Sequence, residues 1–280
     1  MDDTLLEKRF LRMVEEDIGP CDITTTFSPD KKVKAEIVAK DDGVISGISE
    51  LLVLFRLFSI KAKALAKDGE KVKKKQRIFL LEGRSRDILI VERTAINILS
   101  RMSGISTLTR QYVAKASAAN PKAVVAATRK TTPLFGFFEK KAVKAGGGDT
   151  HRLGLYDLVL IKDNHLRLFK DNVGSALKAA RKETSFSHKI EIEAKKIEDA
   201  LLAAEYGADI IMLDNMSVPE IKRAVSGLEK MGLRGRVLLE VSGGITLENI
   251  DEYAKTGVDI ISIGRITHSA PSLDISLEIL

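Results

Sequence analysis

The sequence predicts an α/β protein with a small open-faced α+β unit first and a parallel β/α barrel second. The main observation is a change of pattern near residue 120, where irregular strands and one long helical stretch give way to regular alternation. From there on, short apolar runs alternate with helical stretches of 10–20 residues. Nearly continuous apolar strands separated by helices are typical of a parallel sheet that is covered on both faces.

The first part of the chain reads as a helix, several strands and a long helix. Residues 5–18 carry apolar side chains at helical spacing. Residues 33–47 look like two strands around the turn at Asp41, Asp42 and Gly43, and 51–58 is an apolar helix. Residues 68–83 give further strands, with the lysine-rich run at 68–78 interpreted as a solvated hairpin. From Ile88 to about Asn120 the pattern is helical.

A carrier-domain reading of this part is the weaker alternative. The glycine turns near residues 43 and 69 have some similarity to lipoyl or biotinyl carrier half-repeats. Such a carrier needs a lysine at a tight hairpin tip between matched strands, and the sequence offers no clean tip of this kind. An open-faced α+β unit therefore fits better.

Six short apolar runs supply the expected barrel strands. They lie at 123–127, 157–161, 189–194, 209–214, 236–241 and 258–263. Helices are expected between most of them, at 173–183, 197–207, 217–232 and 247–257. Each run contains or is followed by a polar or glycine cluster, and the C-terminal strand ends of such a barrel form the face that holds the active site. The sequence therefore predicts one site built from six strand ends.

Basic side chains dominate the predicted site. Arg129 and Lys130 follow the first run, His151 and Arg152 precede the second, and Lys162 follows it. The planar fork of arginine pairs with carboxylate or phosphate through two hydrogen bonds. Arg93, in the long helix, is a further candidate, although an ordinary surface salt bridge explains it equally well.

Glycines and carboxylates complete the predicted site. The segments Ser242–Gly244 and Ile263–Arg265 follow the last two strands, where barrels frequently bind phosphate. Glu193 and Asp214 end two adjacent strands and are suited to ribose hydroxyls or Mg²⁺, unless they serve only as counter-ions for Lys130 and Lys162. The site as a whole suits a phosphorylated sugar together with an acidic co-substrate.

Composition excludes several classes of protein. Cys21 is the only cysteine, so the chain forms no internal disulfide, and the cysteine and histidine positions lack zinc-site spacing. The acidic N-terminus lacks the layout of a secretory signal, and no apolar run approaches a membrane span, so we expect a cytoplasmic protein without a membrane partner. The net charge of +6 comes without a nucleic-acid-binding module or interleaved aromatics, so we expect no nucleic-acid partner.

Motifs along nearly the whole chain resemble those of the quinolinate phosphoribosyltransferase family. They are EDIGPCDITT (16–25), ERTAIN (92–97), MSGIST (102–107), ATRKTTP (127–133), EKKAVKAGGGDTHRLGLYDLVLIKDNH (139–165), EIE (191–193), MLDN (212–215), SGG (242–244) and GRITHS (264–269). A relative from molybdate-transport operons shares the HRLGL part but typically not KDNH, so Lys162–His165 favours the enzyme.

The resemblance implies an N-terminal open-faced α/β sandwich (1–105, with 269–280 packing on it) and an incomplete α/β barrel (106–268). It implies that quinolinate and phosphoribosyl pyrophosphate react, with Mg²⁺ and no organic cofactor, to give nicotinate mononucleotide, pyrophosphate and CO2. It also implies a homodimer or higher assembly with shared active sites, in which Arg93 reaches quinolinate in the neighbouring subunit.

The resemblance also assigns roles to individual residues. It places Thr128, Arg129, Lys130, His151 and Arg152 around quinolinate. Lys130, Lys162, Glu193 and Asp214 take the catalytic positions near pyrophosphate, sugar and metal. Ser242, Gly243, Gly244, Ile263, Gly264, Arg265 and His268 surround the 5′-phosphate.

The chain departs from the family pattern at four positions. Leu134 and Gly136 stand where the family usually has glycine and arginine, Lys141 replaces a common tyrosine, and Cys21 replaces a glycine. Two other functions stay open at this stage. A Schiff-base aldolase would also use a lysine at a barrel strand end, and a non-enzymatic anion binder would share the cationic site.

Overall fold

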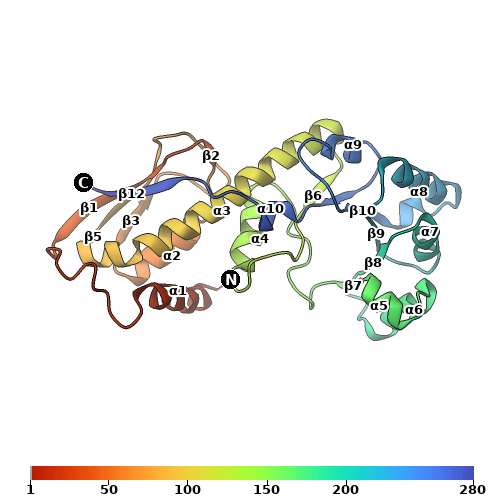
Figure 1. The fold of residues 1–280 in the computed structure, drawn as a ribbon, viewed down its shortest axis with the longest axis horizontal. Helices are drawn as coiled ribbons and strands as arrows, with labels where there is room; N and C mark the ends of the chain where they lie inside the picture. The colour runs from red at the N-terminus through yellow and green to blue at the C-terminus, as the bar shows by residue number, and fades with distance from the viewer. Residues whose placement is uncertain (1) are drawn as a thin grey trace. The chain divides into compact units, whose positions relative to one another are not determined.

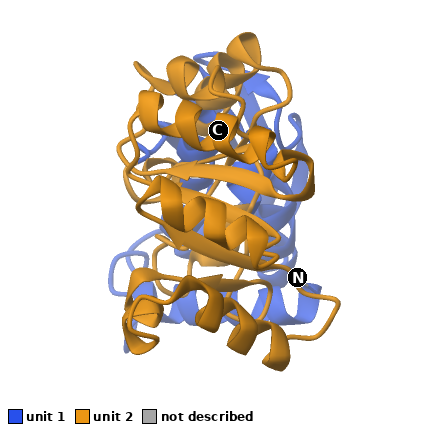
Figure 2. Ribbon diagram, turned by 90° about the vertical axis from the view of Figure 1, so that its right-hand side faces the viewer, with its two compact units in different colours: residues 1–108, 141–147, 270–280 blue, residues 109–140, 148–269 orange. Residues whose placement is uncertain are grey.

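The chain folds into two units, which Figure 2 distinguishes by colour in the computed structural model of residues 2–280. The first unit consists of the chain up to Leu108 together with 141–147 and 270–280, and the second consists of 109–140 and 148–269. None of the helices among residues 2–280 has both the length and the apolar character required to cross a bilayer.

The first unit is built on an antiparallel sheet with the strand order β12-β1-β5-β3. Its strands are β1 (Lys32–Ala39), β3 (Lys61–Ala64), β5 (Arg77–Arg84) and β12 (Ile275–Ile279). Two helices, α1 (Asp3–Ile18) and α2 (Ile48–Leu57), supply apolar side chains to its core. Phe55 of α2 meets Phe79 of β5 edge-on, with ring centroids 5.5 Å apart. The C-terminal end of the chain is thus an edge strand of the N-terminal sheet (Figure 1).

Two strands lie around the turn at Asp41, Asp42 and Gly43, as expected, whereas the hairpin expected at 68–78 is wrong. β2 (Gly43–Val44) does not pair with β1, and β4 (Lys71–Val72) does not pair with β5; they pair with each other. The side chain of Asp42 joins the two turns, because it accepts hydrogen bonds from Nζ of Lys73 at 2.7 Å and from the backbone N–H of Lys74 at 2.9 Å. A pairing between strands that are distant in sequence therefore replaces the local hairpin at 68–78.

The helix expected from Ile88 to about Asn120 is confirmed as α3 (Ser85–Ala119). A second helix, α4 (Gly136–Ala145), was not predicted. Phe138, Ala142 and Val143 are buried on it, and Phe138 stacks on Phe135 with ring centroids 4.8 Å apart. Its short apolar face explains why an isolated reading of the sequence passes over it.

The second unit contains six parallel strands in the order β6-β11-β10-β9-β8-β7, which confirms the predicted alternation of strands and helices. They are β6 (Val124–Ala126), β7 (Val159–Ile161), β8 (Ile190–Ala194), β9 (Ile210–Asp214), β10 (Leu238–Ser242) and β11 (Ile260–Ser262). The helices of this unit are α5 (Asp163–Leu168), α6 (Val173–Glu183), α7 (Ile197–Glu205), α8 (Val218–Lys230), the 3₁₀ turn η1 (Arg234–Arg236), α9 (Ile250–Ala254) and α10 (Arg265–His268).

The strand register brings the strand ends to one edge. Ser242 lies beside Asp214 on one side and Ser262 on the other, and Ser262 lies beside Ala126. The strand order starts at β6 and stops at β7, so the barrel is incomplete, as expected from the family resemblance.

Candidate active site

One cavity of about 660 Å³ lies at the C-terminal ends of the six parallel strands. Its size is in the usual range for small-molecule sites. All the residues predicted for the site line it, with the exception of Arg93: Thr128, Arg129, Lys130, His151, Arg152, Lys162, Glu193, Asp214, Ser242, Gly243, Gly244, Ile263, Gly264, Arg265 and His268. The ends of all six strands therefore line one cavity, and the roles predicted for these residues stay predictions.

Arg93 belongs to a different surface. Its side chain is exposed on α3 in the first unit and lines a separate hollow with Asp17, Cys21 and Asp22. The cavity of the second unit is therefore formed without it.

The segment after β6 carries Arg129 and Lys130 and is fixed by its neighbours. The backbone N–H of Lys130 donates to Oγ1 of Thr128 at 3.1 Å. The hydroxyl of Thr267, on α10, donates to the carbonyl of Lys130 at 2.7 Å. The side chains of Arg129 and Lys130 are both exposed, so they are accessible to a ligand.

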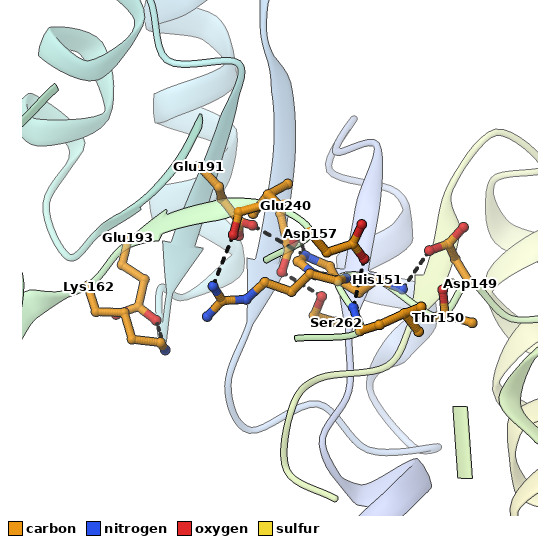
Figure 3. Close-up of polar contacts among 12 residues, drawn as sticks. Asp149, Thr150, His151, Asp157, Lys162, Glu191, Glu193, Glu240 and Ser262 are labelled. Carbon is orange, nitrogen blue, oxygen red and sulfur yellow. Dashed lines mark hydrogen bonds and ion pairs between the residues drawn. The ribbon is translucent and has the colours of Figure 1, made fainter. Parts of the chain in front are cut away.

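Lys162 and Glu193 form an ion pair across the ends of β7 and β8. Nζ of Lys162 lies 2.5 Å from Oε1 of Glu193, as Figure 3 shows. Glu193 is therefore a counter-ion for Lys162 in this structure, one of the interpretations left open by the sequence. The ion pair occupies Nζ of Lys162, whereas a Schiff-base nucleophile needs this nitrogen free to attack a carbonyl.

The glycines after β10 bring backbone close to a neighbouring loop. Gly243 has a φ of 101°, and a Cβ built there would lie 2.1 Å from Oδ1 of Asn215. The backbone N–H of Asn215 donates to the carbonyl of Ser242 at 2.8 Å, which joins the two loops. After β11, a Cβ on Gly264 would lie 3.0 Å from Cδ of Lys130. These open, tightly joined loops provide room for an anion next to exposed backbone.

Two glutamates that were not singled out from the sequence lie beneath this rim. Glu240 and Glu191 are both fully buried, and both side chains turn towards His151 (Figure 3). Nε2 of His151 is 2.9 Å from Glu240 and 3.4 Å from Glu191. Ser262 donates to the other oxygen of Glu240 at 2.5 Å. The two-residue periodicity of a strand could have identified them. Glu191 and Glu240 lie two residues before the predicted Glu193 and Ser242, so each points to the same face of its strand as the predicted residue.

The tautomer of His151 follows from its contacts. The backbone N–H of Arg152 donates to Nδ1 at 2.8 Å, which leaves the ring proton on Nε2, facing Glu240. Burial opposes a second proton on this ring, but the hydrogen bond to Glu240 and the negative charge of that carboxylate outweigh it and raise the pKa of His151. Both ring nitrogens are thus engaged within the protein.

Glu191 has an unusual environment for a carboxylate. Neither of its oxygens has a hydrogen-bond partner. Burial, and then the charge of Glu240, raise the pKa of Glu191 to about 8. Burial therefore favours the protonated form of Glu191.

The site offers two places for a cation. His151, Glu191 and Glu240 are the only group of three or more potential ligands among residues 2–280 whose ligand atoms lie within 4.8 Å of one another. This group is buried against the positive charge of Arg152, which does not favour Mg²⁺. At the rim, Glu193 and Asp214 offer carboxylate oxygens to the cavity, the donor type that Mg²⁺ prefers.

A barrel-like α/β domain that collects three arginines, three lysines, several carboxylates and glycine loops in one cavity is an enzyme domain for phosphorylated, acidic small molecules. Comparison with known proteins agrees. The model of the quinolinate phosphoribosyl transferase C-terminal domain matches residues 105–278, and that of the N-terminal domain matches 22–103. The chain belongs to the quinolinate phosphoribosyl transferase family.

Curated relatives and solved structures support this membership. A probable nicotinate-nucleotide pyrophosphorylase [carboxylating] from Archaeoglobus fulgidus is 49% identical over 255 residues, which cover 91% of this chain and 97% of the relative. The solved structure of NadC from Streptococcus pyogenes is 33% identical, with a TM-score of 0.91, and the match covers 100% of this chain and 99% of that one. The nicotinate-nucleotide pyrophosphorylase from Francisella tularensis is 35% identical, with a TM-score of 0.90, covering 100% and 98%.

Proposed function

We propose that the chain transfers the phosphoribosyl group of phosphoribosyl pyrophosphate to quinolinate and releases CO2, which yields nicotinate mononucleotide and pyrophosphate for NAD biosynthesis. The observation that carries the proposal is the single cavity that combines Arg129, Arg152, Lys130 and Lys162 with glycine loops after β10 and β11. Family membership and the names of the relatives support the same reaction.

Quinolinate would bind at the β6 side of the cavity. Arg129 and Arg152 would take its two carboxylates, with Thr128 and Lys130 beside them. His151 lines the same part of the cavity, but its ring nitrogens face Glu240 and Arg152. We therefore assign His151 mainly the task of holding the floor of the quinolinate site.

Phosphoribosyl pyrophosphate would lie across the remaining strand ends. Its 5′-phosphate would contact the loops of Ser242–Gly244 and Ile263–Arg265, close to His268, and its ribose hydroxyls would face Glu193 and Asp214. The two rim carboxylates fit Mg²⁺, which proteins usually hold through one or two carboxylates together with substrate phosphates. The ion would supply charge neutralisation for the pyrophosphate.

The chemistry follows from this placement. The pyridine nitrogen attacks C1′ of the sugar, and the bond from C1′ to pyrophosphate breaks. Lys130 and Lys162 stabilise the negative charge that grows on the leaving group, an interaction that is stronger in the transition state. The ring nitrogen is now cationic, so its positive charge stabilises the electron pair that stays on the adjacent carbon as CO2 departs. Lys130 then gives that carbon a proton.

We further propose a homodimer or higher assembly with shared active sites. Arg93 supports this proposal because it is exposed and does not line the cavity of its own second unit. It would complete the quinolinate site of the neighbouring subunit. The cytoplasmic location expected from the sequence stays a prediction.

The direct test is to incubate the purified protein with quinolinate, phosphoribosyl pyrophosphate and Mg²⁺ and to follow nicotinate mononucleotide, pyrophosphate and CO2. All three products should form in equal amounts. Binding of quinolinate without release of pyrophosphate would instead indicate an anion-binding protein. Trapping of a carbonyl substrate by borohydride would indicate an aldolase.

A further inference from the structure

His151 has a backbone conformation that is unfavourable for its side chain. Its φ is 50°, in the left-handed region where residues other than glycine are uncommon. Such a conformation persists only where the surroundings enforce it. It also directs the imidazole to Glu240 and leaves the neighbouring Arg152 lining the cavity. The geometry of the quinolinate site thus depends on whatever holds residue 151.

Lys140 provides the main restraint on this segment. Its Nζ donates to the carbonyl of Thr150 and, at 3.1 Å, to the carbonyl of Arg152. It therefore holds the residues on both sides of His151. From the opposite direction, Oδ1 of Asp149 accepts the backbone N–H of His151 at 2.6 Å. The backbone of Asp149 is itself anchored, because it bridges to Ala126 at the end of β6.

The burial of Lys140 is costly and is not explained by an ion pair. The residue is 3% exposed, and no carboxylate lies within ion-pair distance of it in the part of the chain that the structure describes. Burial lowers the pKa of Lys140 to about 8, with Arg152 and Arg129 acting in the same direction and Asp149 and Asp157 opposing them. An apolar side chain of this length would avoid the desolvation cost. Within residues 2–280, the ammonium donates hydrogen bonds only to the two carbonyls that flank His151.

We propose that Lys140 is a positioning residue of the quinolinate site, which holds His151 in its left-handed conformation and thereby aligns the His151–Glu240 contact and the Arg152 side chain for the acid substrate. The inference rests on the proposed function. It assigns Lys140 no contact with substrate, since the residue does not line the cavity.

The test compares Lys140→Met, which keeps the length of the side chain but removes its donors, with Lys144→Met, an exposed lysine on the same helix. In Lys140→Met, kcat/KM for quinolinate should fall about 100-fold, because small misplacements of binding groups have effects of this order. KM for phosphoribosyl pyrophosphate should change by less than about 3-fold, because the hydrogen bonds of Lys140 go to the carbonyls of Thr150 and Arg152 and not to the loops after β10 and β11. Lys144→Met should match the wild type.

A crystal structure of Lys140→Met supplies a readout that is independent of activity. Residue 151 should leave the left-handed region, and the contact between His151 and Glu240 should be lost. The inference is overturned if residue 151 keeps its φ in Lys140→Met. It is also overturned if the substitution impairs the kinetics for quinolinate and for phosphoribosyl pyrophosphate equally. A wild-type protein that makes no nicotinate mononucleotide would overturn the proposed function instead, and the φ of residue 151 would still decide the role of Lys140.

Asp149→Ala covers the case in which Lys140→Met does not fold. This substitution removes the carboxylate that accepts the backbone N–H of His151. The side chain of Asp149 is exposed, and its backbone bridge to β6 is kept. We expect a smaller but equally selective loss, about 10-fold in kcat/KM for quinolinate. An Asp149→Ala protein with wild-type kinetics and a changed φ at residue 151 would show that this conformation is irrelevant to binding, which would overturn the inference.

Discussion

Nε2 of His151 donates to a carboxylate oxygen of Glu240 at 2.9 Å, and the other oxygen of Glu240 accepts the hydroxyl of Ser262 at 2.5 Å. Glu240 therefore has two donors facing its two oxygens. A glutamine at this position keeps the shape but turns one oxygen into a donor, which conflicts with one of the two partners. We expect Glu240→Gln to lower kcat/KM for quinolinate about 10- to 100-fold. Steady-state kinetics checks this, and Ser262→Ala, which removes only one neutral donor, should lose less than about 10-fold.

Glu191 predicts a pH dependence of stability. Its pKa is raised to about 8 in the folded protein, against 4.5 for an ordinary glutamate. The folded state therefore keeps a proton that the unfolded state has lost, so this contribution to stability is complete below about pH 4.5, declines as the pH rises and is lost by about pH 8. Glu191→Gln removes the titration. Relative to the wild type, the variant should gain about 1–3 kcal/mol of unfolding free energy between pH 5 and pH 8.

Denaturant unfolding at the two pH values measures this gain. Glu198→Gln, at an exposed position on α7, is the matched control and should show no such difference. An identical pH slope in wild type and Glu191→Gln would contradict the protonated state that burial imposes on Glu191.

The sequence was sufficient to predict the barrel strands but not the pairing in the first unit. A run such as 209–214 is apolar throughout because both faces of a parallel strand are covered, and this signal is local. The pairing of β2 with β4 is accompanied by contacts of Asp42 with Lys73 and Lys74, which no local pattern reveals. The expectation of a hairpin at 68–78 failed because β4 pairs with β2 and not with β5.

The rim of the site was predictable, and its floor was not. Arg129, Lys162 and Asp214 stand where apolar runs end, so their position follows from the strand boundaries. Glu191 and Glu240 lie inside the apolar runs. A single glutamate in an apolar run does not by itself indicate a functional site, because glutamate is rarely fully buried. Only the fold shows that one histidine joins them.

Gly243 predicts a selective effect on the phosphate side of the cavity. Alanine there would meet Oδ1 of Asn215 and would adopt an unfavourable φ of 101°. The loop should shift, and Gly243→Ala should raise KM for phosphoribosyl pyrophosphate about 10-fold, with little change in KM for quinolinate. Gly235→Ala in η1, where the added Cβ meets nothing within 4 Å, is the control. Equal effects of the two substitutions on both KM values would speak against a phosphate-binding role of the loop.

Arg152 should contribute directly to the binding of the acid substrate. It is 8% exposed and lines the cavity, and one of its guanidinium nitrogens already donates to the carbonyl of Leu158 at 3.2 Å, which fixes its direction. A charge-assisted hydrogen bond contributes about 1.5–3 kcal/mol, so Arg152→Ala should lower kcat/KM for quinolinate about 10- to 200-fold. Unchanged kcat/KM would refute the assigned role.

Arg93 tests whether active sites are shared between subunits. Arg93→Ala and Lys162→Ala should each be inactive, for different reasons: the first lacks the cation supplied to the neighbouring site, and the second lacks the cation at the end of β7. A hybrid dimer would contain one site in which both cations are intact. Mixing the two variants under conditions of subunit exchange should therefore restore activity, up to about a quarter of the wild-type value per subunit at equal amounts, because about half of the dimers are hybrids and each has one complete site.

Asn97→Ala, at an exposed position one turn further along α3, should be active alone. If mass spectrometry shows that hybrids form and the mixture stays inactive, Arg93 acts within its own chain or not at all.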